Sequence, residues 1–238
     1  MAIIALPWGP KLLYGIITDT FPICRSRKKS YLVLCGFLQA CAALILAVVP
    51  FERYEFAVLF GLILYLSQAF MDVVVDGLMV MESRKDPKQG SVDLQTFSWA
   101  MFGVGGTLFG TLGGFLLEHT SANVIFFVTA ALGLILGISG FALDSNLEHS
   151  SNEIIQMSLW ARIKLNSTQI KEGFTIRELR NTITFMFLFA SVVPNFGDYM
   201  YYFYMDELNF SKLEYSLLSV IGNVLLLLVV LGYNLFFA

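Results

Sequence analysis

Long apolar runs separated by short polar segments dominate the pattern of this chain. Seven of these runs approach or exceed the roughly 20 residues that a helix needs to cross a hydrocarbon core. None alternates with the period of two that a membrane β-barrel requires. The pattern therefore predicts seven membrane-spanning helices: Ile3–Thr18, Tyr31–Val49, Phe56–Met81, Leu94–Leu117, Val124–Leu143, Thr182–Met205 and Tyr215–Phe237.

The polar segments between the runs differ sharply in positive charge, and this difference predicts an orientation. Segments on one side hold twelve Lys and Arg residues, whereas those on the other side hold only Arg53 and Lys212. Because cytoplasmic loops carry the excess of Lys and Arg, we expect the twelve to face the cytoplasm. They are Arg25, Arg27, Lys28, Lys29, Arg84, Lys85, Lys88, Arg162, Lys164, Lys171, Arg177 and Arg180.

The longest polar segment, Asp144–Arg180, separates five of the runs from the last two. It predicts a division into an N-terminal helical lobe at 1–143, a central cytoplasmic loop at 144–180, and the start of a second lobe at 181–238. The middle of the loop, Ile154–Ile163, is either a helix on the inner membrane face or a plain linker.

Composition agrees with a helical membrane protein and excludes several other classes. Charged residues make up 14% of the chain, against about 25% in soluble domains. A net charge of −3 gives no reason to expect a nucleic-acid partner. The three cysteines, the two histidines and the absence of a nucleophile or P-loop motif predict no disulfide framework, no metal site, no cofactor and no enzyme.

Three ionisable residues lie inside the predicted spans: Lys11, Asp72 and Asp76. Each costs roughly 2.5–3.5 kcal/mol at the centre of a membrane helix, so such residues usually face a partner or a cavity. Counted from the inner ends of the spans, at about 1.5 Å per residue, Lys11 lies at a depth between the two aspartates. Asp72 and Asp76 share one helix face, and two carboxylates so close favour protonation of one. We therefore predict a Lys–Asp cluster that lines a polar pathway; the alternative is an ion pair that only joins two helices.

The first cytoplasmic turn carries a second pattern. A glycine and an aspartate four residues apart, at the inner end of the first span, precede a tight group of basic residues. The glycine permits close helix contact, and the aspartate can cap a helix or pair with the basic turn. The pattern resembles the loop signature of the major facilitator superfamily, although residues 21–23 stand where a glycine is usual. Its members here are Gly15, Asp19, Arg25, Arg27 and Lys28.

Longer blocks resemble the folate–biopterin transporter family and follow the family order along almost the whole chain. The resemblance implies twelve helices in two lobes of six, of which this all-α chain holds helices two to eight, a partial major-facilitator fold. The blocks include Leu6-Pro7-Trp8, Asp72-Val73-Val74-Val75-Asp76-Gly77, Asp93-Leu94-Gln95, Val193-Pro194, Tyr201-Tyr202-Phe203-Tyr204 and Gly232-Tyr233-Asn234.

The resemblance also implies a function. Members of that family are secondary transporters of folates, pterins or related anions, and are taken to work by alternating access with proton coupling. Lys11 would then be the counter-charge for an anionic solute, and the helix with Asp72 and Asp76 would line the cavity. The expected partners are the lipid bilayer, a small anionic solute and protons. A carrier of a different solute, and a non-transporting remnant or partner membrane protein, stay open as alternatives.

Two further features bear on mechanism. Gly106, Gly110 and Gly114 repeat at the four-residue spacing that predicts close helix packing. The segment 194–199 interrupts the sixth predicted span, because proline removes a backbone donor and glycine loosens the helix. This break is either a simple kink or a gate or binding element. Candidate solute contacts beside it are Asp198, Tyr201 and Tyr202, since aromatic rings suit a flat pterin.

Overall fold

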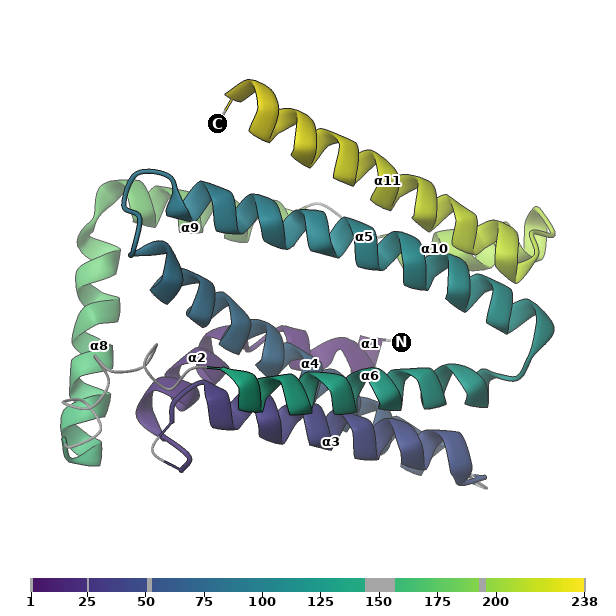
Figure 1. Ribbon diagram of the computed structural model, residues 1–238, viewed down its shortest axis with the longest axis horizontal. Helices are drawn as coiled ribbons and strands as arrows, with labels where there is room; N and C mark the ends of the chain where they lie inside the picture. The colour runs from purple at the N-terminus through teal and green to yellow at the C-terminus, as the bar shows by residue number, and fades with distance from the viewer. Residues whose placement is uncertain (1, 25, 51–52, 144–156, 193–195, 238) are drawn as a thin grey trace.

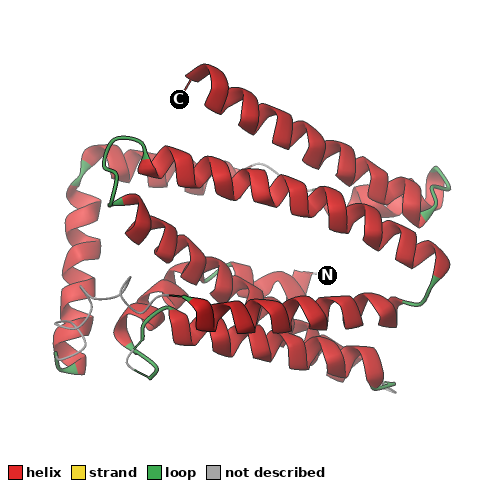
Figure 2. Ribbon diagram, viewed as in Figure 1, coloured by secondary structure: helices red, strands yellow, loops and turns green. Residues whose placement is uncertain are grey.

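The computed structural model describes residues 2–24, 26–50, 53–143, 157–192 and 196–237. Within these ranges every regular element is a helix (Figures 1 and 2). Five of the described helices are long and apolar enough to cross a membrane, which agrees with an integral, multi-pass membrane protein. They are α3 (Lys29–Val48), α4 (Tyr54–Ser83), α5 (Gly90–His119), α6 (Ala122–Ala142) and α11 (Lys212–Phe237).

The other two predicted spans are interrupted instead of continuous. The first consists of α1 (Ala2–Ala5), the 3₁₀ turn η1 (Leu6–Trp8) and α2 (Lys11–Thr20). The sixth consists of α9 (Arg177–Val192), α10 (Gly197–Tyr202) and the π-helical turn η3 (Phe203–Glu207), while Pro194 and Asn195 lie outside the described residues. Prolines at positions 7 and 10 explain the first interruption, because a proline cannot donate the backbone hydrogen bond that a continuous helix needs.

The helices form two groups that lie side by side in Figure 1. α3 packs between α4 and α6, with α1 and α2 against α4, and α5 packs along α11. The α3–α6 contact brings backbones together: a Cβ atom at Gly36 would lie 2.5 Å from the Cα of Gly137. Only glycine permits so close an approach, which in lipid supplies the van der Waals contact that holds helices together.

The α5–α11 contact confirms the close packing predicted for the glycine repeat. A Cβ atom at Gly106 would lie 2.5 Å from the side chain of Asn223, and one at Gly114 would lie 2.5 Å from that of Ser216. The Ser216 hydroxyl donates to the carbonyl oxygen of Gly110 at 2.5 Å. Gly106 and Gly114 thus form notches that polar side chains of α11 fill.

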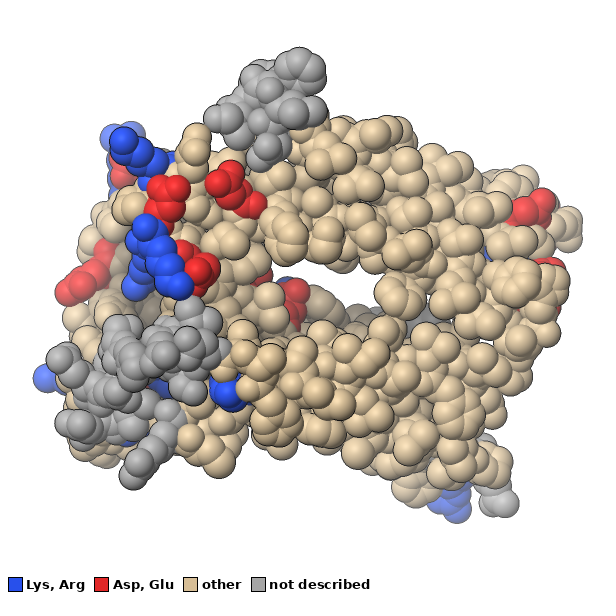
Figure 3. Space-filling model, viewed as in Figure 1, with Lys and Arg blue, Asp and Glu red and all other residues tan. Residues whose placement is uncertain are grey.

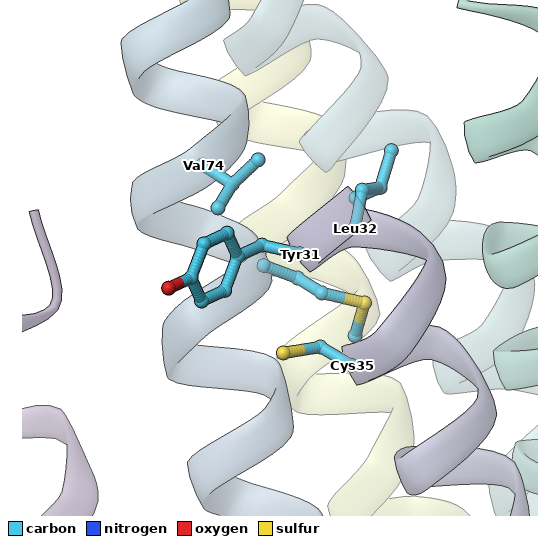
Figure 4. Close-up of a cluster of buried hydrophobic side chains, with 5 residues drawn as sticks. Tyr31, Leu32, Cys35 and Val74 are labelled. Atoms are coloured by element: carbon cyan, nitrogen blue, oxygen red, sulfur yellow. The ribbon is translucent and has the colours of Figure 1, made fainter. Parts of the chain in front are cut away.

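A small core joins the first turns of α3 to the second half of α4. Tyr31, Leu32 and Cys35 of α3 meet Met71 and Val74 of α4 (Figure 4), and each of these side chains is at most 7% exposed. The Tyr31 hydroxyl donates to the carbonyl oxygen of Phe21 at 2.7 Å. This core fixes α4 relative to the turn that follows α2.

In Figure 3 most of the visible charged side chains lie toward one end of the molecule, beside a broad surface that is almost free of Lys, Arg, Asp and Glu. That end holds the α2–α3 and α4–α5 turns and the helix α8 (Leu159–Thr175), which crosses the ends of the other helices in Figure 1. The middle of the central loop is therefore helical from Leu159, and Ile154–Gln156 lie outside the described residues. Ser158 caps α8 by accepting a hydrogen bond from the backbone of Ala161 at 3.3 Å.

Candidate functional site

The break in the first predicted span places a lysine at the start of a helix. Pro7 lies in η1 and Pro10 directly precedes Lys11, so that α2 begins at the lysine. The Tyr14 hydroxyl donates to the carbonyl oxygen of Pro7 at 2.9 Å. This hydrogen bond satisfies a backbone acceptor that the interrupted helix leaves unpaired.

The structure brings Lys11 and Asp72 together. The Lys11 Nζ lies 2.5 Å from the Asp72 Oδ2, and it also lies 4.4 Å from the centre of the Trp8 ring, where a cation–π contact forms. Both charged side chains are a little over a third exposed, at 38% and 39%. The pair joins α2 to α4 without being sealed between them, and its role in transport stays a prediction.

Asp76 lies one turn farther along α4 and is exposed. It is close enough to Asp72 and Lys11 to interact electrostatically with both. None of the ion pairs found among the described residues includes Asp76. The predicted cluster of one lysine and two aspartates is thus assembled, with one aspartate in contact with the lysine and the other facing open space.

That space is a cavity of about 730 Å³ between α2, α4, α8 and α9. Its walls are mainly apolar, with a few polar groups and an aromatic ring among them. This composition is common for small-molecule sites, in which apolar surface supplies area and a few polar groups orient the ligand. The polar and aromatic residues that concern us are Lys11, Asp19, Asp76, Asn166, Gln169 and Phe174.

The turn between α2 and α3, which the sequence predicts to be cytoplasmic, is held by a second lysine–aspartate pair. The Lys28 Nζ lies 3.0 Å from the Asp19 Oδ1 and donates to the Thr18 hydroxyl at 3.1 Å. The Lys28 stem lies against Gly77 of α4, where an added Cβ atom would lie 3.0 Å from both Cε and Nζ. Lys28 is thus one partner of Asp19 in the predicted loop signature.

The remaining members of the loop signature are Gly15, Arg25 and Arg27. Gly15 faces Val73 of α4, whose side chain would lie 3.7 Å from an added Cβ atom. Arg25 lies outside the described residues, and Arg27 adjoins the turn. Cys24 adopts a positive φ of 51° in that turn, close to the position where the superfamily pattern usually has a glycine.

Sequence reasoning missed the contribution of α8 to the cavity. The Arg162 guanidinium donates to the carbonyl oxygen of Thr20 at 3.0 Å, and the Asn166 amide donates to the Thr20 hydroxyl at 3.0 Å. These contacts join residues about 145 positions apart, which no local pattern reveals. The sequence does place apolar residues at helical spacing along α8, at Leu159, Ile163, Ile170 and Phe174, which was the available signal for a packed helix.

The candidate contacts beside the second break do not line this cavity. Tyr201 packs edge-on against Tyr202 and Tyr215, with ring centres 5.4 and 5.0 Å apart. Asp198 lies in α10, and its side chain is outside the described part of the chain. The structure therefore keeps these aromatic residues apart from the cavity that contains Lys11. Among the described residues, no group of three His, Cys, Asp or Glu is placed to hold a metal ion.

Comparison with known proteins gives a family match over the whole chain: the model of the BT1 family matches residues 1–238. Folate transporter 1 of Plasmodium falciparum (isolate 3D7) is 24% identical over 237 residues, which cover 100% of this chain and 45% of that protein. The folate-biopterin transporter of Synechocystis sp. (strain ATCC 27184 / PCC 6803 / Kazusa) is 28% identical over 206 residues, covering 87% of this chain and 40% of that protein.

A third relative, the probable folate-biopterin transporter 4 of Arabidopsis thaliana, is 32% identical over 128 residues, covering 53% of this chain and 26% of that protein. The chain thus spans less than half the length of each of these three relatives. No solved structure matches the chain significantly.

Proposed function

Since the chain belongs to the BT1 family along its whole length, we propose that it forms part of a secondary transporter for folate, biopterin or a related organic anion. The relatives named for folate or folate and biopterin support this solute class. The observation that carries the proposal is the lysine at the start of α2, paired with Asp72 beside an open cavity of about 730 Å³.

The ammonium group of Lys11 supplies the chemistry that an anionic solute needs. A lysine has three N–H donors, and Asp72 accepts from one of them at 2.5 Å. Because the Lys11 side chain is more than a third exposed and lines the cavity, its other donors are available for a carboxylate or an acidic ring oxygen. The apolar walls lower the local dielectric constant, which strengthens such a contact relative to water.

Asp72 gives this site a means of proton coupling. When Asp72 takes up a proton, it ceases to compete for Lys11, and the lysine can turn its full charge toward the solute. When the proton leaves, Asp72 recovers the lysine and the solute is released. Alternating access, with the cavity open to one side of the membrane at a time, would couple these two events to transport.

Uptake of labelled folate and biopterin by cells that express the protein tests the proposal. We expect Lys11→Ala to abolish uptake, and Asp72→Asn to leave residual uptake that no longer depends on the external pH. Lys85→Ala is a matched control, because Lys85 forms an exposed pair with Glu82 at the end of α4, away from the cavity. Normal, pH-dependent uptake by the Lys11 and Asp72 variants would contradict the proposal.

A further inference from the structure

Helix α8 is held against the end of α2 through one buried residue. Thr20 is 1% exposed. Its carbonyl oxygen and its hydroxyl accept hydrogen bonds from Arg162 and Asn166, each at 3.0 Å. The two donors are four residues apart and therefore share one face of α8. These two hydrogen bonds hold that face of α8 against α2. They thereby also fix the direction in which the rest of α8 runs.

The fixed face brings the next turns of α8 to the cavity. Gln169 and Phe174 both line it. Phe174 is 47% exposed, and no hydrogen bond found within the described ranges occupies the Gln169 carboxamide. An unoccupied carboxamide and a bare aromatic ring therefore lie on one wall of a cavity whose other wall holds a charged lysine.

The two walls are separated along the cavity. Thr20, on which α8 rests, follows Lys11 by nine residues of the same helix, which is about 13 Å at 1.5 Å per residue. Helix α8 therefore reaches the cavity from the Thr20 end of α2, whereas Lys11 stands at the opposite end of that helix. This arrangement suits an elongated solute with an anionic group at one end and a flat, hydrogen-bonding ring at the other.

We propose that α8 forms the inner wall of the solute site and that Gln169 is a specificity-determining residue for the ring of the solute. A carboxamide offers both a donor and an acceptor, which matches the edge of a heteroaromatic ring that carries both. Phe174 supplies a face for stacking on that ring, and Asn166 positions the helix through Thr20. This inference rests on the proposed function and adds to it the orientation of the solute, with its anionic group toward Lys11.

Binding by the purified chain in lipid nanodiscs tests the orientation with three probes. Folic acid has both ends, biopterin has the ring without carboxylates, and 4-aminobenzoylglutamate has the carboxylates without the pterin. We expect Gln169→Ala to weaken folic acid and biopterin about fivefold, the usual effect of one lost hydrogen bond, and to leave 4-aminobenzoylglutamate unchanged. Lys11→Ala should weaken folic acid and 4-aminobenzoylglutamate more than biopterin.

Thr168→Ala is the matched control on the same helix, since Thr168 is exposed and does not line the cavity. A second measurement does not depend on affinity. In a background with Cys24 and Cys41 replaced by serine, Gln169→Cys should react with a maleimide more slowly when folic acid is bound. Thr168→Cys should react at the same rate with and without folic acid.

The outcomes separate the two proposals. If Lys11→Ala loses binding while Gln169→Ala keeps all three affinities and Gln169→Cys is not protected, the assignment of α8 is overturned and the proposed function stands. If the unmodified chain binds none of the three probes, the proposed function is overturned and the assignment of α8 fails with it. Selective loss of the ring-bearing probes with protection at position 169 supports both.

Discussion

Two lysine–aspartate pairs anchor the first span, and they differ in what surrounds the lysine. The Lys28 side chain is 8% exposed, its stem lies on Gly77, and its ammonium contacts both Asp19 and Thr18. The Lys11 side chain is 38% exposed and borders a cavity. A lysine whose side chain is packed on all sides is held in one conformation with one set of partners. A partly exposed lysine can release its carboxylate and contact another group. Under the proposed function, the two similar pairs serve different purposes, with Lys28 holding the turn and Lys11 available to a solute.

The largest expected loss of stability follows from removing the buried lysine. Lys28→Met keeps most of the volume but leaves Thr18 and Asp19 without their donor. Because Asp19 is 41% exposed, water compensates part of the loss, and we expect about 2 kcal/mol, below the usual cost of breaking a buried pair. The loss of stability is measured by thermal unfolding in nanodiscs. Unfolding is monitored through the reaction of the buried Cys35 thiol with a maleimide dye.

For this measurement Cys24 and Cys41, which are exposed, are replaced by serine so that only Cys35 reports. Lys88→Met serves as the control, because Lys88 is exposed in the α4–α5 turn. Equal thermal unfolding midpoints for the Lys28 and Lys88 variants would show that Lys28 does not hold the turn. The contrast drawn between the Lys28 and Lys11 pairs would then be wrong.

A smaller loss is expected from crowding the same lysine. In Gly77→Ala the new Cβ atom would lie 3.0 Å from the Lys28 Cε and Nζ, so the lysine must shift by a few tenths of an ångström. Overpacking of this kind costs about 1 kcal/mol. Gly113→Ala is the control, since a Cβ atom there meets nothing within 4 Å, and it should be neutral or slightly stabilising.

A double-variant cycle then sharpens this prediction. In the Lys28→Ala background the long stem is gone, so adding Gly77→Ala should cost almost nothing. If Gly77→Ala destabilises the protein equally in both backgrounds, its effect does not act through Lys28.

The smallest effect on stability is expected at Lys11. Lys11→Gln breaks a pair whose members are both more than a third exposed, so the loss should stay below about 1 kcal/mol. Binding of folic acid should nevertheless fall at least tenfold, since contacts to a charged donor are worth about 1.5–3 kcal/mol. The same Cys35 reaction and nanodisc binding assay measure both values. A Lys11 variant that unfolds as readily as Lys28→Met would make both pairs structural.

Much of this site follows from the sequence because depth in a membrane is a one-dimensional quantity. Charge in an apolar run is costly, so Lys11, Asp72 and Asp76 needed partners, and counting residues from the span ends put Lys11 at a depth between the two aspartates. The structure pairs Lys11 with Asp72 at 2.5 Å. The glycine repeat of α5 was equally readable, since small residues at four-residue spacing predict close packing.

Other features were not readable from the sequence, because they depend on how the helices pack. The first span was predicted as one short helix, yet it is divided at η1, although Pro7 and Pro10 gave the signal. Contact of Tyr201 and Tyr202 with a solute stays a prediction; in the structure Tyr201 packs on Tyr202 and on Tyr215. An aromatic block has the same composition whether it faces a cavity or its neighbours, and the sequence alone does not separate the two.

The sequence by itself determined the membrane class and the family, because these depend on local hydropathy and on short blocks of residues. Only the tertiary structure decided that Lys28 lies on Gly77, that α8 rests on Thr20, and that Lys11 faces a cavity. These contacts join segments that are far apart in the chain. The packing of all the helices together decides which face of each helix makes them.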